Sequence, residues 1–188
     1  SFGDGEPKFS NTLTIQAGAN VPPIAGNLTI TPSSPLSTSD LTANYDYFDA
    51  DGDPESGSEI RWYKDGALQP DLNNSRGVRA SLTAKHEQWR FTIRPRDGIE
   101  FGGLQTSSTV TILNSPPTFT DVYITPDPAF DANTLTANSY GWADADGDAE
   151  GYVYRWQIFE GGSWQNISGQ TSPTLGPAYS DKGDSVRV

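Results

Sequence analysis

The chain has 188 residues and carries 24 Asp and Glu against 12 Lys and Arg, which gives a formal net charge of −12. This acidic balance argues against nucleic acid as a partner, because duplex binding needs basic patches that displace counterions, and cations become the expected partners. Cys and Met are both absent, which excludes disulfides, thiol catalysis and thiolate metal sites. No apolar run approaches the roughly 18 residues that a transmembrane helix needs.

Short strand-like stretches fill residues 16–113, where Thr, Val and aromatic residues alternate with polar ones and Gly, Pro, Asn and Asp lie between the stretches. In chain order the predicted strands are 28–31, 41–48, 59–64, 67–69, 78–84, 88–94 and 106–113. No helical periodicity is present. The pattern predicts an all-β fold, an antiparallel immunoglobulin-like sandwich of about seven strands with Trp62 in its core.

The sequence repeats with an offset of 94 residues. Pro22-Pro23 returns as Pro116-Pro117, LTAN at 41–44 returns at 135–138, and Arg61-Trp62 returns as Arg155-Trp156. We therefore expect tandem sandwiches, a complete one at 16–113 and a second at 114–188, with Trp156 in the second core.

The two ends of the sequence look complementary. SNTLTI at 10–15 is similar to SSTVTI at 107–112, so we expect residues 1–15 to be the last strands of a preceding or neighbouring repeat. The repeat at 114–188 lacks its last strand or strands and would be completed by the next unit. The residues predicted to lie in strands shared between units are Phe2, Leu13, Ile15, Val186 and Val188.

This pattern fits one period of a longer repetitive polypeptide, and it fits equally a subunit whose N-terminal segment completes a neighbour. A proteolytic fragment is the third interpretation.

An acidic motif, DADGD, occurs once in each repeat, at 49–53 and 144–148, and a Glu follows each copy. Alternate carboxylates on a tight Gly turn suit Ca²⁺, which takes six to eight oxygen ligands. The spacing is not that of an EF-hand. A hairpin turn with solvated carboxylates is the alternative. The candidate calcium ligands are Asp49, Asp51, Asp53 and Glu55 in the first repeat and Asp144, Asp146, Asp148 and Glu150 in the second.

The remaining motifs say less about function. Asn27, Asn73 and Asn166 each begin an Asn-x-Ser/Thr sequon, which would be glycosylated in an exported protein of a suitable host. The one histidine, His86, lies in a polar turn, and no nucleophile motif or phosphate-binding Gly loop accompanies it. We expect no enzymatic activity.

The acidic motifs and the Arg-Trp pairs that follow them, at 49–62 and 144–156, resemble the immunoglobulin-like, polycystic-kidney-disease-type and cadherin-like repeats of bacterial and archaeal surface proteins. Residues 180–188 are similar to the approach to a late strand in such modules. The resemblance implies an extracellular or cell-surface structural protein, a unit of a filament, sheath or surface layer that assembles with itself head to tail. The alternative is an adhesive or carbohydrate-binding module of a larger secreted protein, with surface glycans as partners.

Overall fold

The structure is a computed structural model that describes residues 12–13 and 18–188. It is an all-β fold of small antiparallel sheets and three 3-10 turns. Among the described residues no helix is long and apolar enough to cross a membrane. The elements are β1 (Ile24–Thr31), β2 (Leu41–Phe48), β3 (Glu59–Lys64), β4 (Ala67–Leu68), η1 (Pro70–Leu72), β5 (Gly77–Val78), η2 (Ala80–Leu82), β6 (Gln88–Arg94), β7 (Gln105–Thr106), β8 (Val110–Thr111), β9 (Asp121–Thr125), β10 (Leu135–Tyr140), β11 (Gln157–Glu160), β12 (Ser163–Asn166), β13 (Thr174–Leu175), η3 (Pro177–Tyr179) and β14 (Val186–Arg187).

The strands β1 to β8, here called the first unit, form two antiparallel sheets that face each other across one core. One sheet has the order β1-β2-β5, and the other has the order β4-β3-β6-β7 with β8 also on β6. Alternation in β6 turns Trp89, Phe91 and Ile93 inward, and all three are buried beside Trp62. Trp62 is 0% exposed, which confirms its predicted place in the core.

Most predicted strands of the first unit are confirmed, and 41–48, 59–64 and 88–94 have the predicted bounds. The strand predicted at 78–84 is wrong beyond Val78, because η2 replaces it. There the amide of Ala80 donates to the Asp40 carboxylate (2.7 Å) rather than to a strand partner. The strand predicted at 106–113 is divided into β7 and β8, and Ser107 lies between them and exchanges hydrogen bonds with the Phe91 backbone.

The strands β9 to β14, here called the second unit, form two smaller antiparallel sheets, β13-β10-β9 and β12-β11-β14. Their core surrounds Trp156, which is 0% exposed, so this prediction is also confirmed. The Trp156 indole donates to the Ser172 carbonyl at 2.9 Å, and the Trp62 indole donates to the Ser75 carbonyl at the same distance. The sequence repeat is therefore a repeat of hydrogen bonds as well.

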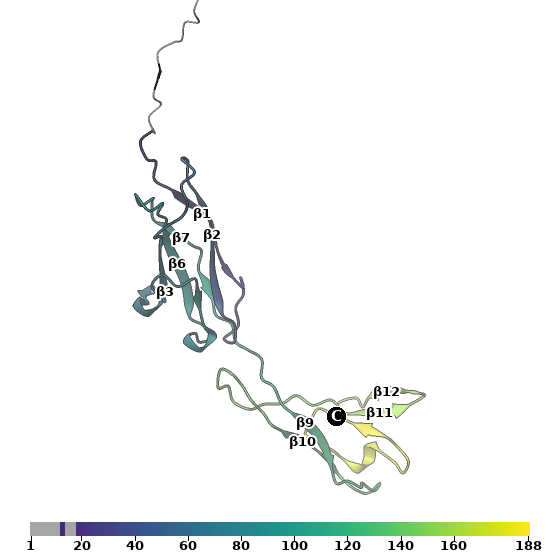
Figure 1. The fold of residues 1–188 in the computed structure, drawn as a ribbon. Coiled ribbons are helices and arrows are strands. Elements are labelled where there is room, and N and C mark those ends of the chain that lie inside the picture. Colours follow the sequence, from purple (N-terminus) through teal and green to yellow (C-terminus); the bar gives the residue numbers. More distant parts are fainter. Residues whose placement is uncertain (1–11, 14–17) are drawn as a thin grey trace, which may run out of the picture.

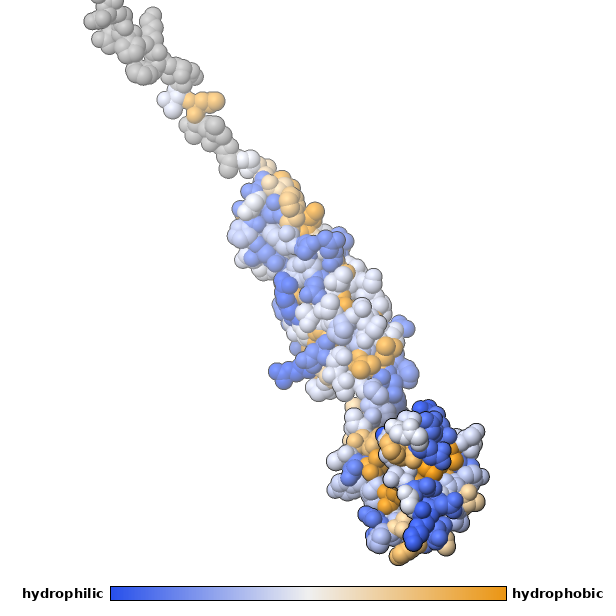
Figure 2. Space-filling model, turned by 90° about the vertical axis from the view of Figure 1, so that its right-hand side faces the viewer, coloured by the Kyte–Doolittle hydropathy of each residue, from blue (hydrophilic) through white to orange (hydrophobic). Residues whose placement is uncertain are grey.

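The two units lie end to end, and the chain passes once from β8 to β9 (Figure 1). No sheet contains strands of both units in the described part of the chain. In the view of Figure 2, hydrophobic side chains gather on the surface of the second unit. The exposed hydrophobic residues Val122, Tyr123 and Phe130 line an open groove of this unit.

Candidate functional site

The first acidic loop, residues 49–53, connects β2 to the approach of β3. The Asp49 carboxylate organises it, since Oδ1 accepts hydrogen bonds from the amides of Asp51 (2.8 Å) and Asp53 (3.1 Å). Gly52, with φ of 82°, allows the tight turn between them. Asp49, Asp51 and Asp53 each offer a carboxylate oxygen, and these oxygens lie within 4.8 Å of one another. This cluster could hold a metal ion.

Asp49 also carries the least satisfied oxygen of the first acidic loop. Its side chain is buried, with 9% of the residue exposed, and Oδ2 has no hydrogen-bond partner among the described residues. A buried carboxylate oxygen without a donor is costly in a folded protein. A bound cation would satisfy it.

The first acidic loop is tied to the segment through which the chain enters the first unit. The Val21 amide donates to Asp51 Oδ2 at 2.7 Å. The Asn20 side-chain amide donates to Asp97 Oδ2 at 2.9 Å, and this bond, with backbone amides, holds the pKa of Asp97 below its ordinary value. The loop therefore lies at the end of the first unit that faces whatever precedes it.

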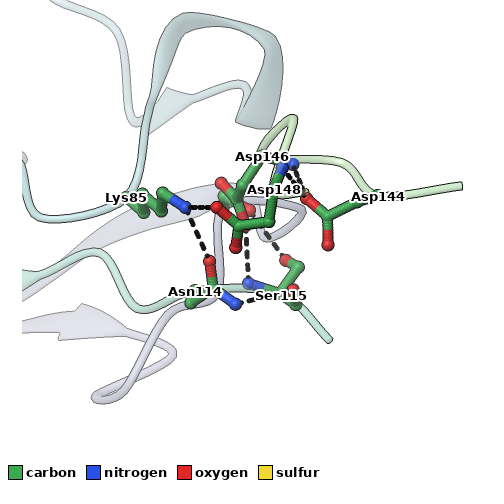
Figure 3. Close-up of polar contacts among 7 residues, drawn as sticks. Lys85, Asn114, Ser115, Asp144, Asp146 and Asp148 are labelled. Atoms are coloured by element: carbon green, nitrogen blue, oxygen red, sulfur yellow. Dashed lines mark hydrogen bonds and ion pairs between the residues drawn. The ribbon is translucent and has the colours of Figure 1, made fainter. Parts of the chain in front are cut away.

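The second acidic loop, residues 144–148, repeats this geometry. Asp144 Oδ1 accepts from the amides of Asp146 (2.8 Å) and Asp148 (2.9 Å), and Asp144 Oδ2 is again buried without a partner in the described chain. The Ser115 amide donates to Asp146 Oδ2 at 2.7 Å (Figure 3), as the Val21 amide does to Asp51 Oδ2. This bond holds the pKa of Asp146 below its ordinary value. Here too the loop contacts the segment that enters its unit.

A lysine of the first unit reaches into the second acidic loop. Lys85 Nζ contacts Asp148 Oδ1 and also donates to Asn114 Oδ1 at 3.1 Å (Figure 3). The hydrogen bond to Asp148 raises the pKa of Lys85. The joint between the units therefore has its own ion pair. Lys85 was not among the predicted site residues, although a lysine-containing turn stands before β6 and before β14, at 84–87 and 181–184.

The two glutamates predicted as ligands do not join the acidic loops. Glu55 accepts a hydrogen bond from the Tyr45 hydroxyl at 2.7 Å and faces Arg76 at 3.8 Å. Burial and this hydrogen bond raise the pKa of Tyr45 to about 12. Glu150 accepts from the Tyr152 hydroxyl at 2.6 Å. Both carboxylates thus have tyrosine partners, which the motif alone did not indicate.

The predicted sequon residues Asn27, Asn73 and Asn166 are all exposed. Trp142 and Trp164 are half-buried and pack against Tyr152 and Phe159, respectively.

The residues predicted for shared strands fall in two places. Phe2 and Ile15 lie outside the described residues, and Leu13 is 81% exposed. Val186 and Val188 pack against the second core.

An open groove of about 900 Å³ lies on the second unit, between residues 129–131 and residues 180–188. Phe130 lines it and is 71% exposed. In the first unit the matching segment, 35–37, is covered. There Leu36 pairs with Leu113, the Leu113 amide donates to the Pro35 carbonyl (2.7 Å), and Ile112 is 0% exposed.

No protein-family model and no curated protein sequence matches the chain.

Proposed function

We propose that the chain is a structural unit of an extracellular filament, sheath or surface layer of a bacterium or archaeon, built of tandem immunoglobulin-like sandwiches that complete one another head to tail. The open groove of the second unit carries this proposal. Its occupant is a segment with the sequence of residues 1–15 from the next unit. The occupant is the same whether the next unit is a separate molecule or a continuation of the chain.

The first unit supplies the template for this joint. Trp89 of β6 pairs with Val110 of β8. In the second unit β14 takes the part of β6, since Val186 pairs with Ile158 as Trp89 pairs with Lys64.

The offset from Trp89 to Val186 is 97, and the offset from Leu13 to Val110 is also 97. Leu13 of the next unit would therefore lie opposite Val186, and Ile15 would take the place of Ile112.

Physical chemistry favours the completed state. Val110 and Ile112 are buried in the first unit, and burying such a side chain is worth about 1.5–3 kcal/mol. An added strand also pairs backbone groups that an edge strand leaves open. The charge of −12 keeps units soluble before they join. A filament joined in this way transmits tension through hydrogen-bonded sheets.

We also propose Ca²⁺ as the ion of the first acidic loop, because its three carboxylates are hard oxygen donors. Bound calcium would stiffen the end of the first unit where the joint with a preceding unit would form. Its affinity should fall in the range of roughly 10⁻⁴–10⁻³ M that is typical of extracellular modules.

Self-association of the purified chain tests the assembly. Sedimentation velocity and negative-stain microscopy should show concentration-dependent linear oligomers, and Leu13→Asp should abolish them by placing a charge in the core of the joint. Thr12→Asp is the matched control, because its counterpart Thr109 is exposed in the first unit. A wild-type chain that stays monomeric at high concentration, or a Thr12→Asp effect as large as that of Leu13→Asp, would refute the assembly.

A glycan is the alternative occupant of the groove, because Tyr123 and Phe130 line it. Specific binding of a soluble glycan, with no self-association, would favour the carbohydrate-binding module.

A further inference from the structure

We propose that the Lys85 ammonium group takes the place of a metal ion in the second acidic loop. The chain then binds one divalent cation, at Asp49, Asp51 and Asp53, and not two. This inference rests on the proposed calcium site, and its test does not require the proposed assembly.

The two acidic loops share one feature that favours a nearby cation. Each has an aspartate whose Oδ1 accepts two loop amides and whose Oδ2 is buried without a partner in the described part of the chain. Asp49 in particular is more than nine-tenths buried. Because a buried carboxylate is unfavourable unless it is paired, a nearby cation would stabilise either loop.

Among the described residues, only the second acidic loop receives a protein cation, which contacts Asp148 and leaves Asp144 Oδ2 without a partner. Lys85 Nζ contacts Asp148 there, and the lysine and aspartate side chains are 26% and 41% exposed. Among the described residues no Lys or Arg forms a salt bridge with Asp49, Asp51 or Asp53. The described chain brings three carboxylates within metal-binding distance in the first acidic loop alone.

The second unit has a lysine at the corresponding position, because Lys182 lies in the turn that corresponds to the turn of Lys85. The Asp181 amide donates to the Asp184 carboxylate as the Ala84 amide donates to Glu87, and 181 lies 97 residues after 84. In an assembled filament Lys182 would thus face the first acidic loop of the next unit.

The connection between units differs, however. Two residues lie between Ile112 and Ser115, but five lie between Ile15 and Val21. The three additional residues add up to about 10 Å of chain. The longer connection between Ile15 and Val21 would not hold the lysine of the preceding unit close to the first acidic loop. That loop would therefore keep its metal ion.

Amide chemical shifts test this assignment loop by loop. Gly52 and Gly147 lie at matching positions in the two loops, so ¹⁵N-labelled chain titrated with CaCl₂ at constant ionic strength reports each loop separately. The titration uses the Leu13→Asp background to keep the chain monomeric, so a failure of assembly does not disturb the result. We expect the Gly52 amide to shift with calcium and the Gly147 amide to stay in place.

Removal of the lysine should create the second site. In Lys85→Met the Gly147 amide should respond to calcium over the same range as Gly52, and adding Asp51→Asn should abolish the Gly52 response only. Lys182→Met is the matched control and should leave Gly147 silent. A calcium response of Gly147 in the parent chain, a silent Gly147 in Lys85→Met, or a silent Gly52 throughout would each overturn the proposal.

Discussion

Ile112 is the residue whose replacement measures what the last strand contributes to a complete unit. It is 0% exposed, and its amide and carbonyl bond to Glu87 and His86. The change Ile112→Ala removes three buried carbon atoms and keeps both backbone bonds. The loss is therefore one of packing.

The magnitude follows from hydrophobic transfer and cavity formation. Three buried carbons at about 0.8 kcal/mol each amount to about 2.4 kcal/mol, and the residual cavity raises the expected loss to roughly 3–4 kcal/mol. Thr111→Ala is the control, because Thr111 is exposed in the neighbouring position, and a surface change of this kind should cost less than about 0.5 kcal/mol.

Urea unfolding followed by hydrogen exchange of β3 and β6 reads the first unit separately from the second. A loss below about 1 kcal/mol for Ile112→Ala would show that the strand is not part of the core, since buried Ile→Ala changes cost about 2–5 kcal/mol. Such a result would also contradict the proposed joint between units, because the joint is inferred from the packing of this strand in the first unit.

Two further predictions concern the first unit. Gly102→Ala should lower its melting temperature, because the added Cβ would lie 1.8 Å from the Pro23 carbonyl oxygen, and a calorimetric scan that matches wild type would contradict this close packing. The Asp97 carboxylate has a lowered pKa because Asn20 donates to it, so the stability it contributes is present above its unfolded-state pKa and is lost as pH falls through the lower folded value. Asp97→Asn should flatten that part of the stability profile in urea melts at stepped pH, whereas an unchanged slope would refute the assignment.

Strand positions were largely predictable from the sequence because local alternation decides them. The bounds of β2, β3 and β6 follow from alternation around Leu41, Trp62 and Phe91. The failure at 79–84 has a local cause that periodicity does not contain. Asp40, forty residues away, caps the backbone of η2.

The candidate site was predictable in its motif and unpredictable in its partners. Repetition of DADGD identified both acidic loops, and Gly in each supports the turn. Glu55 was assigned to the ligand set because it lies close in sequence, but Tyr45 from the neighbouring strand accounts for it. Lys85 is 63 residues from Asp148, and only the packing of one unit on the next brings them together.

Intermolecular disulfide formation tests head-to-tail completion most directly, and the absence of native cysteines means that only the introduced thiols can react. One preparation carries Leu13→Cys and the other Val186→Cys, and the two are mixed and oxidised. Residues directly opposite on paired strands have Cβ atoms about 4.5–5.5 Å apart, close enough for a disulfide after small adjustments. We predict a cross-linked species at twice the 20.3 kDa of the chain, absent when Thr12→Cys replaces Leu13→Cys. Equal cross-linking from Thr12→Cys, or none from Leu13→Cys, would contradict the proposed joint.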